Sequence, residues 1–193
     1  MEARMPDTTP IPNTAAAVDF LERLLGEKRW DLAAIPPDGG SPEFRTFLPY
    51  EHHLAPAWIE VRQGKSGLYY SPNELVSGRL NVKAKKADIA TARVLHVDVD
   101  IHSETVLQAL RSFAPAPTVI VFSGGGYQAL WRLSEPSTEF DRVERTNAWL
   151  ARQLGGDNCH NIDRLLRLPG TINLPNAKKR GAGRVPVLAR VVE

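Results

Sequence analysis

Apolar residues between positions 15 and 28 recur with the period of an α-helix. Thr14 is the predicted N-cap of this helix, and Gly26 is its predicted end. The stripe expected to face the core consists of Val18, Leu21, Leu24 and Leu25. Residues 1–13 are polar and contain proline, so we expect a disordered N-terminal segment before the helix.

Residues 35–90 carry a weaker pattern. The stretch IPPDGGSPEF at 35–44 is a predicted loop because of its proline and glycine content. Runs rich in aromatic and β-branched residues predict three short strands, RTFLPY at 45–50, AWIEVRQ at 57–63 and GLYYS at 67–71. A basic cluster follows at Lys83, Lys85 and Lys86.

The second half of the chain is more regular. Strands are predicted for ARVLHVDVDI at 92–101, PTVIVFS at 117–123, YQALWRL at 127–133 and RVPVLARVV at 184–192. Helices are predicted at 103–113, with Ser103 as its cap, and at 137–156. The order βαββαβ indicates a split-βαβ sheet covered by helices on one face.

Composition narrows the class of protein. The chain has 193 residues, of which 42% are hydrophobic and 24% charged, and this suits one compact soluble domain. A net charge of only +2 permits a local nucleic-acid contact without demanding one. A single cysteine, Cys159, excludes a disulfide framework. No apolar run approaches the roughly 20 residues of a membrane span, so we expect a cytoplasmic protein.

Two carboxylates stand out on the strand at 92–101. Asp98 and Asp100 point to the same strand face, with Cα atoms roughly 6.6 Å apart at a rise of about 3.3 Å per residue. Two carboxylates at that spacing can jointly hold a hard divalent cation. A pair of solvated surface aspartates is the alternative, and for an isolated Asp-x-Asp it is the commoner one.

Two later segments add polar groups. Three glycines at 124–126 separate two apolar strands. They either form a tight turn or let a phosphate group approach the backbone. Polar side chains at the same edge come from Ser123, Tyr127 and Gln128. The segment NIDRLLRLPGTINLP at 161–175 supplies a third carboxylate, Asp163. Arg164 and Arg167 follow it and suit phosphate groups. Alternatively, Asp163 caps a helix or pairs with one of these arginines.

In this order and spacing, VLHVDVD, SGGGYQALWRL and NIDRLLRLPGTINLP resemble the motifs of the archaeo-eukaryotic primase superfamily. The resemblance is strongest to its plasmid- and phage-encoded primase-polymerases, including the RepB-type primases. It covers roughly residues 40–180, because GLYYSPNEL and KAKKADI also look like the segment before the family's Asp-x-Asp strand.

The resemblance implies an α/β (α+β) fold, in which an RRM-like split-βαβ core packs against an N-terminal α/β module. We therefore expect one catalytic domain at 14–193, with the module at 14–90 and the metal-binding core at 91–193. It also implies template-directed nucleotidyl transfer, as a DNA primase or DNA polymerase, in replication of a plasmid, phage or other mobile element. Mg²⁺ or Mn²⁺ is the implied cofactor of a two-metal mechanism. A DNA template and primer, dNTP or NTP, and a helicase domain or subunit are the implied partners.

Residue by residue, the first family motif falls on Asp98 and Asp100 and the third on Asp163, which makes these three the expected catalytic and metal-binding residues. The expected nucleotide-binding residues are Ser123, Gly124, Gly125, Gly126, Tyr127, Gln128, Arg164 and Arg167. The chain departs from the family at Gln128, where a histidine is usual, and glutamine cannot become cationic. A metal-dependent nuclease and a non-catalytic nucleic-acid-binding module are the alternative functions.

Overall fold

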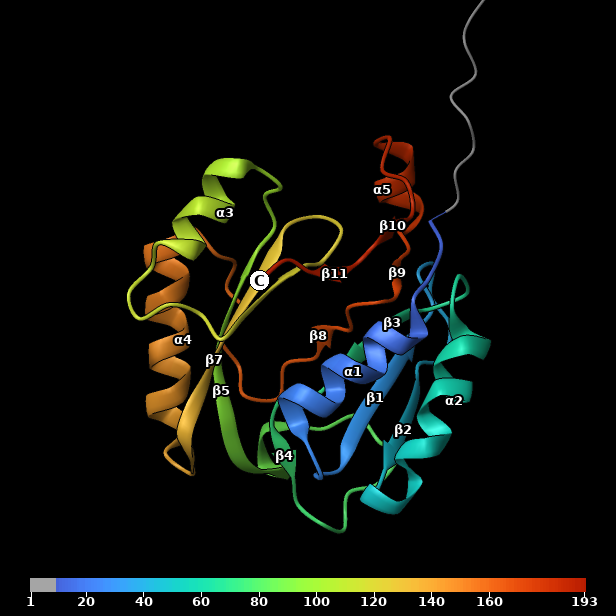
Figure 1. Cartoon of the computed structure of the whole chain (residues 1–193), viewed down its shortest axis with the longest axis horizontal. Coiled ribbons are helices and arrows are strands. Elements are labelled where there is room, and N and C mark those ends of the chain that lie inside the picture. The colour runs from blue at the N-terminus through green and yellow to red at the C-terminus, as the bar shows by residue number, and fades with distance from the viewer. Residues whose placement is uncertain (1–9) are drawn as a thin grey trace, which may run out of the picture.

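The computed structural model describes residues 10–193 as two antiparallel sheets with helices packed on them (Figure 1). The disorder expected for residues 1–13 falls largely on residues 1–9, outside the described part of the chain. Within residues 10–193, no helix has both the length and the apolar character to cross a membrane.

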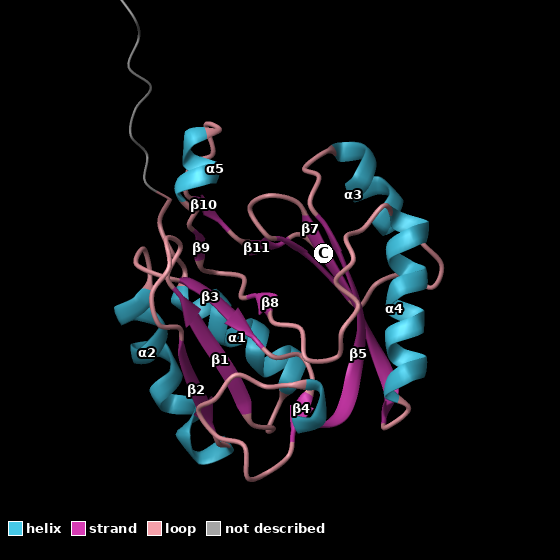
Figure 2. Cartoon of the chain, turned by 180° about the vertical axis from the view of Figure 1, so that it is seen from behind, coloured by secondary structure: helices cyan, strands magenta, loops and turns pink. Residues whose placement is uncertain are grey.

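The first sheet belongs to the N-terminal half and has the strand order β2-β1-β3-β8. Helices α1 and α2 lie side by side on one of its faces (Figure 2). Most of these elements precede residue 76, but β8 comes from the C-terminal half and pairs with β3. Their bounds are α1 Thr14–Leu25, β1 Trp30–Ile35, β2 Glu43–Phe47, α2 Ala55–Arg62, β3 Gly67–Tyr70 and β8 Leu166–Arg167.

The second sheet has the order β11-β6-β7-β5-β4, and α3 and α4 cover its outer face. Its elements are β4 Glu74–Leu75, β5 Ile89–Val99, α3 Glu104–Arg111, β6 Val119–Phe122, β7 Tyr127–Ser137, α4 Phe140–Leu154 and β11 Arg190–Val191. A small pair, β9 Ile172–Asn173 and β10 Val187–Leu188, and helix α5 Ala177–Gly181 complete the fold. Because β7 lies between β5 and β6, the predicted split-βαβ arrangement is confirmed.

The closing strand takes a different place from the one a simple βαββαβ sheet would give it. That topology would put it beside β5, whereas β11 pairs with β6 at the opposite edge. The free edge of β5 is already occupied, by β4 at one end and by the loop after α4 at the other. The final strand therefore extends the sheet where an edge is open.

Four local predictions were wrong. The predicted strand at 45–50 ends at Phe47 and is followed by a 3-10 helix at Pro49–Leu54. The predicted strand at 184–192 is divided into β10 and β11, which belong to different sheets. AWIEVRQ forms part of helix α2, because Ala55 and Ile59, four residues apart, are the positions it buries. The helical spacing also stacks Arg62 on the Trp58 ring, 4.2 Å from its centroid. The N-cap of α1 is Asn13 rather than Thr14, since the Asn13 side chain accepts a hydrogen bond from the Ala16 amide at 3.0 Å.

Helix α1 fills the space between the two sheets. Its buried side chains, Ala17, Phe20, Leu21, Leu24 and Leu25, pack in one core cluster with residues of both sheets. From the second sheet this cluster includes Val94, Val121 and Leu130, which lie on the face opposite α3 and α4. The two sheets are therefore joined through a continuous apolar core.

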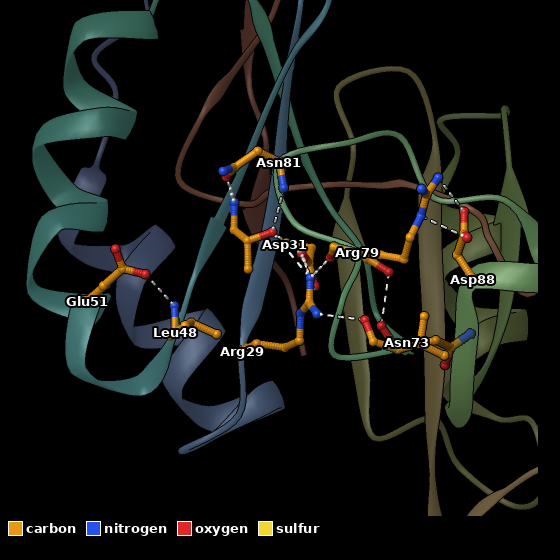
Figure 3. A network of polar contacts seen from close by, with 11 residues as sticks. Arg29, Asp31, Leu48, Glu51, Asn73, Arg79, Asn81 and Asp88 are labelled. Atoms are coloured by element: carbon orange, nitrogen blue, oxygen red, sulfur yellow. Dashed lines mark hydrogen bonds and ion pairs between the residues drawn. The ribbon is translucent and has the colours of Figure 1, made fainter.

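A polar network ties the connection between β4 and β5 to the first sheet (Figure 3). The guanidinium of Arg29 pairs with Asp31, and both side chains are largely buried. Arg29 also donates to the Arg79 carbonyl, and Asn81 accepts from the Thr46 amide at 2.8 Å. Asp88 holds the other end of this loop by its ion pair with Arg79 at 2.9 Å. The loop that carries the basic cluster at 83–86 is thus anchored on both sides.

Candidate active site

Asp98 and Gln128 face each other across neighbouring strands. Val97 and Val99 pack toward α3 and α4, so alternation turns Asp98 to the other face of β5. There the Gln128 carboxamide donates to Asp98 Oδ2 at 3.1 Å and accepts from the Arg167 amide at 3.0 Å. Gln128 is only 5% exposed. This side chain therefore connects the predicted metal ligand to β8 of the other sheet.

The second oxygen of Asp98 is unsatisfied. Asp98 Oδ1 is buried and has no hydrogen-bond partner among residues 10–193. The pKa of Asp98 is raised from 3.8 to about 6, chiefly by burial. The Gln128 hydrogen bond and the charge of Arg164 lower this pKa, while the charges of Asp100 and Asp157 raise it. A carboxylate with one buried free oxygen beside two other acids requires either a proton or a cation. The arrangement fits a divalent metal.

Asp157 is a residue that the sequence analysis missed. Its amide donates to the Asp98 carbonyl at 2.8 Å, so the loop after α4 runs along the edge of β5. The approach is close: a Cβ on Gly156 would lie 3.0 Å from the Asp98 carbonyl oxygen. The Asp157 side chain is exposed, and its charge is felt by Asp98. Gly155-Gly156-Asp157 directly after a long helix was the available signal.

The three glycines form the turn between β6 and β7, which confirms the hairpin. The Ser123 amide donates to the Gly126 carbonyl at 2.9 Å, and Gly124 has a φ of 96°, which favours glycine. A Cβ on Gly125 would lie 2.6 Å from the guanidinium of Arg184 and 4.0 Å from Asp100 Oδ1. The turn thus lies between the Asp100 carboxylate and the Arg184 guanidinium.

Arg167 lies on the far side of the site from β5. Its guanidinium stacks on Tyr69, 4.1 Å from the ring centroid, and donates to the Tyr69 hydroxyl at 2.7 Å and to Asn173 Oδ1 at 3.0 Å. Asn173 in turn donates to the Ser123 carbonyl at 2.8 Å. Burial lowers the pKa of Arg167, and its Nη1 has no partner within the described part of the chain. A buried arginine with a free donor suits a phosphate oxygen.

Comparison with known proteins now decides the family. Residues 52–191 match the profile of the RepB DNA-primase N-terminal domain, which is well over half of the chain. The chain belongs to this family. No curated protein sequence matches it closely enough to add to that assignment. The resemblance to plasmid and phage primases and the α+β fold class inferred from the sequence are both confirmed.

Solved structures of primases have the same fold as this RepB-type domain. Primase RepB′ aligns with a TM-score of 0.68 at 17% identity over 94% of this chain and 56% of its own. The catalytic domain of RepB′ in complex with initiator DNA gives 0.66 at 17% identity, over 94% of this chain and 85% of that one. The AEP domain of the cyanophage S-2L primase-polymerase gives 0.66 at 16% identity, over 95% and 91%. The chain spans just over half the length of RepB′.

Asp163 and Tyr127, also predicted for the site of this RepB-type domain, have different surroundings from Asp98. Asp163 is half-buried and lines a neighbouring cavity of about 430 Å³ together with Tyr69, Lys83 and Arg164. Among residues 10–193, no three Asp, Glu, His or Cys side chains are arranged to hold a metal ion, so neither Asp163 nor Asp157 forms a preassembled set with Asp98 and Asp100. Tyr127 is buried on the helix-covered face. Strand alternation therefore separates it from Gln128.

Proposed function

We propose that this chain is the catalytic domain of a DNA primase-polymerase, which transfers nucleotides onto a 3′-hydroxyl under the direction of a DNA template. Membership of the RepB DNA-primase family supports this, as does the fold shared with the RepB′ catalytic domain crystallised with initiator DNA. The observation that carries the proposal is the buried, unpartnered Asp98 Oδ1, which belongs to a carboxylate that feels the negative charges of Asp100 and Asp157. We further propose that both sheets act as one catalytic unit at 14–193.

The proposed cofactor is Mg²⁺ or Mn²⁺. Asp98 and Asp100 would hold it, and a third carboxylate would complete the site; the charge felt by Asp98 favours Asp157 over Asp163 for that role. Two such ions, held by these carboxylates, would supply activation of the attacking hydroxyl and neutralisation of the pyrophosphate leaving group. The hydrogen bond from Gln128 to Asp98 Oδ2 would keep the Asp98 carboxylate oriented. Its other oxygen, Oδ1, has no partner and would be available to the metal.

Phosphate binding would fall to the residues around the glycine turn. Arg167 is linked to the 123–126 turn through Asn173, and the guanidinium of Arg184 lies against Gly125 of the same turn. Arg164 adds a third positive charge that acts on Asp98. Their fixed charges would orient a triphosphate for in-line attack, so positioning and charge neutralisation supply the rate enhancement. Ser123 and the glycines would form the wall of this pocket.

The proposed macromolecular partner is a DNA template with its primer. The β6–β7 turn and α5 lie at the same end of the molecule (Figures 1 and 2), and α5 carries Lys178, Lys179 and Arg180. Basic side chains beside the proposed metal site suit a phosphate backbone. Synthesis needs a single-stranded template, so a helicase domain or subunit is the expected further partner.

Primer extension tests the proposed function. The purified chain is incubated with template DNA, with and without primer, with Mg²⁺ or Mn²⁺, and with dNTP or NTP in separate reactions. Metal-dependent incorporation is expected. Cleavage of labelled DNA in the absence of nucleotides would instead favour a nuclease, and DNA binding without either reaction would favour a binding module.

We expect Gln128→Ala to destabilise the fold and weaken metal binding more than nucleotide binding. The substitution leaves the buried Arg167 amide without its acceptor, at a cost of about 1–3 kcal/mol. It also removes a hydrogen bond that lowers the pKa of Asp98, so protons compete better with metal. Melting curves and extension rates at varied metal and nucleotide concentrations measure both effects, with the exposed Gln153→Ala as control. A raised KM for nucleotide at unchanged melting temperature would place Gln128 in the nucleotide pocket instead.

A further inference from the structure

We infer that His96 and Asn147 are positioning residues that hold the loop at 156–160 against β5 and thereby place Asp157 beside Asp98 and Asp100. The catalytic meaning of this inference rests on the proposed function, because it concerns the third carboxylate of the same site. Neither side chain is exposed by more than 1%, and neither is among the expected catalytic, metal-binding or nucleotide-binding residues.

The loop replaces a missing strand at the edge of β5. Strand β4 pairs with β5 only at Ile89 and Thr91, so the edge groups further along β5 need other partners. The His96 amide donates to Asn147 Oδ1 at 3.0 Å, and the Asp98 carbonyl accepts from the Asp157 amide at 2.8 Å. Helix α4 and the loop that follows it thus satisfy the edge at the position of the metal ligand.

The two side chains then bind two adjacent carbonyls at the C-terminal end of the loop. His96 Nε2 lies 2.8 Å from the Cys159 carbonyl, and Asn147 Nδ2 donates to the His160 carbonyl at 3.1 Å. Asn147 Nδ2 also lies 3.3 Å from His96 Nδ1. A carbonyl needs a donor and an amide N–H needs an acceptor, so these partners assign a neutral imidazole with its proton on Nε2. Every polar side-chain atom of the pair therefore has a partner.

This geometry fixes a register that apolar packing would not. Leucine-like side chains would fill the same space, but only directed hydrogen bonds specify which carbonyls of the loop face α4 and β5. The close fit of Gly156 adds to this, since a Cβ there would lie 3.0 Å from the Asp98 carbonyl oxygen and 3.2 Å from Ala151 Cα. The main chain of Asp157 is therefore held while its carboxylate remains exposed.

The test compares Asn147→Ala and His96→Leu with the wild-type chain. Each removes a contact to the loop, and we expect Mn²⁺ affinity, measured by electron paramagnetic resonance, to fall about tenfold. Hydrogen exchange at the Asp157 amide should accelerate, and kcat for primer extension should fall more than KM for nucleotide rises. Asn158→Ala is the matched control, because Asn158 is an exposed residue of the same loop. His96→Gln keeps a donor for the Cys159 carbonyl and should recover part of the affinity.

The outcomes separate this inference from the proposed function. Variants that melt at lower temperature but keep wild-type Mn²⁺ affinity and Asp157 exchange would show a purely structural role and overturn the inference. If Asn147→Ala does not fold, the two His96 variants test the inference without it. His96→Gln must then bind Mn²⁺ more tightly than His96→Leu, and equal affinities would overturn the inference. A wild-type chain that binds Mn²⁺ but extends no primer would refute the proposed function, while faster Asp157 exchange in the variants would still support the positioning role.

Discussion

Replacing Asp98 and Asp100 together by asparagine is expected to abolish nucleotide incorporation while leaving the fold intact. Asparagine keeps the shape of both side chains but removes the charges that would hold the metals. Losing several kcal/mol of transition-state stabilisation corresponds to about a thousandfold in rate. Primer extension under single-turnover conditions measures the loss, and Mn²⁺ titration should show that binding is lost as well.

The same double substitution should stabilise the metal-free protein at neutral pH. The folded-state pKa of Asp98 is raised from 3.8 to about 6, so the folded chain holds this proton more tightly than the unfolded chain does. The stability of the metal-free protein therefore falls as pH rises from about 4 to 6 and stays lower above that range. A shift of this size corresponds to roughly 3 kcal/mol, which asparagine would relieve at pH 7 but not at pH 4.

Thermal melting at both pH values, without metal, measures this effect. Glu135→Gln is a suitable control, because Glu135 is an exposed acid on the neighbouring strand β7. Full incorporation by the double variant would refute the assignment of Asp98 and Asp100 as metal ligands. An equal change in melting temperature at pH 4 and pH 7 would refute the electrostatic explanation alone.

A second large effect is expected to distinguish Asp157 from Asp163. We expect Asp157→Asn to lower incorporation about a hundredfold and to weaken Mn²⁺ binding, because removing one ligand costs a few kcal/mol. Asp163→Asn should change the rate only a few-fold. The reason is position: the Asp157 amide bonds to the Asp98 carbonyl, whereas Asp163 lines the cavity beside Tyr69 and Lys83.

Asp157→Asn and Asp163→Asn serve as controls for one another, because each replaces a single aspartate and removes one negative charge. A direct readout is the pKa of Asp98 followed by NMR without metal, which should fall in Asp157→Asn because a repelling charge is gone. If Asp163→Asn has the larger effect on incorporation and metal affinity, Asp163 is the third ligand, as the family motif implies.

Much of the second half of the fold could be predicted from sequence. Strict alternation along 96–100 indicates a strand with Asp98 on one face and two valines on the other, and local geometry alone dictates this. Ser103 as cap, Gly26 as helix end and the 124–126 turn are likewise local effects, and all three are confirmed. The first half was less accessible, because Trp58, Ile59 and Val61 favour strands by composition while packing against the first sheet selects a helix.

Tertiary structure decided how the site is assembled. The order of the motifs in the sequence predicted Asp98, Asp100 and Gln128 as site residues. It did not predict that Gln128 would be buried between Asp98 and the Arg167 amide, because these hydrogen bonds join two separate sheets. It also could not identify Asp157, whose place depends on a loop filling the edge of β5 that β4 leaves unpaired. Side-chain periodicity is a property of one strand or helix, and the sequence by itself determined it. Proximity between carboxylates depends on how separate elements pack, and only the tertiary structure decided it.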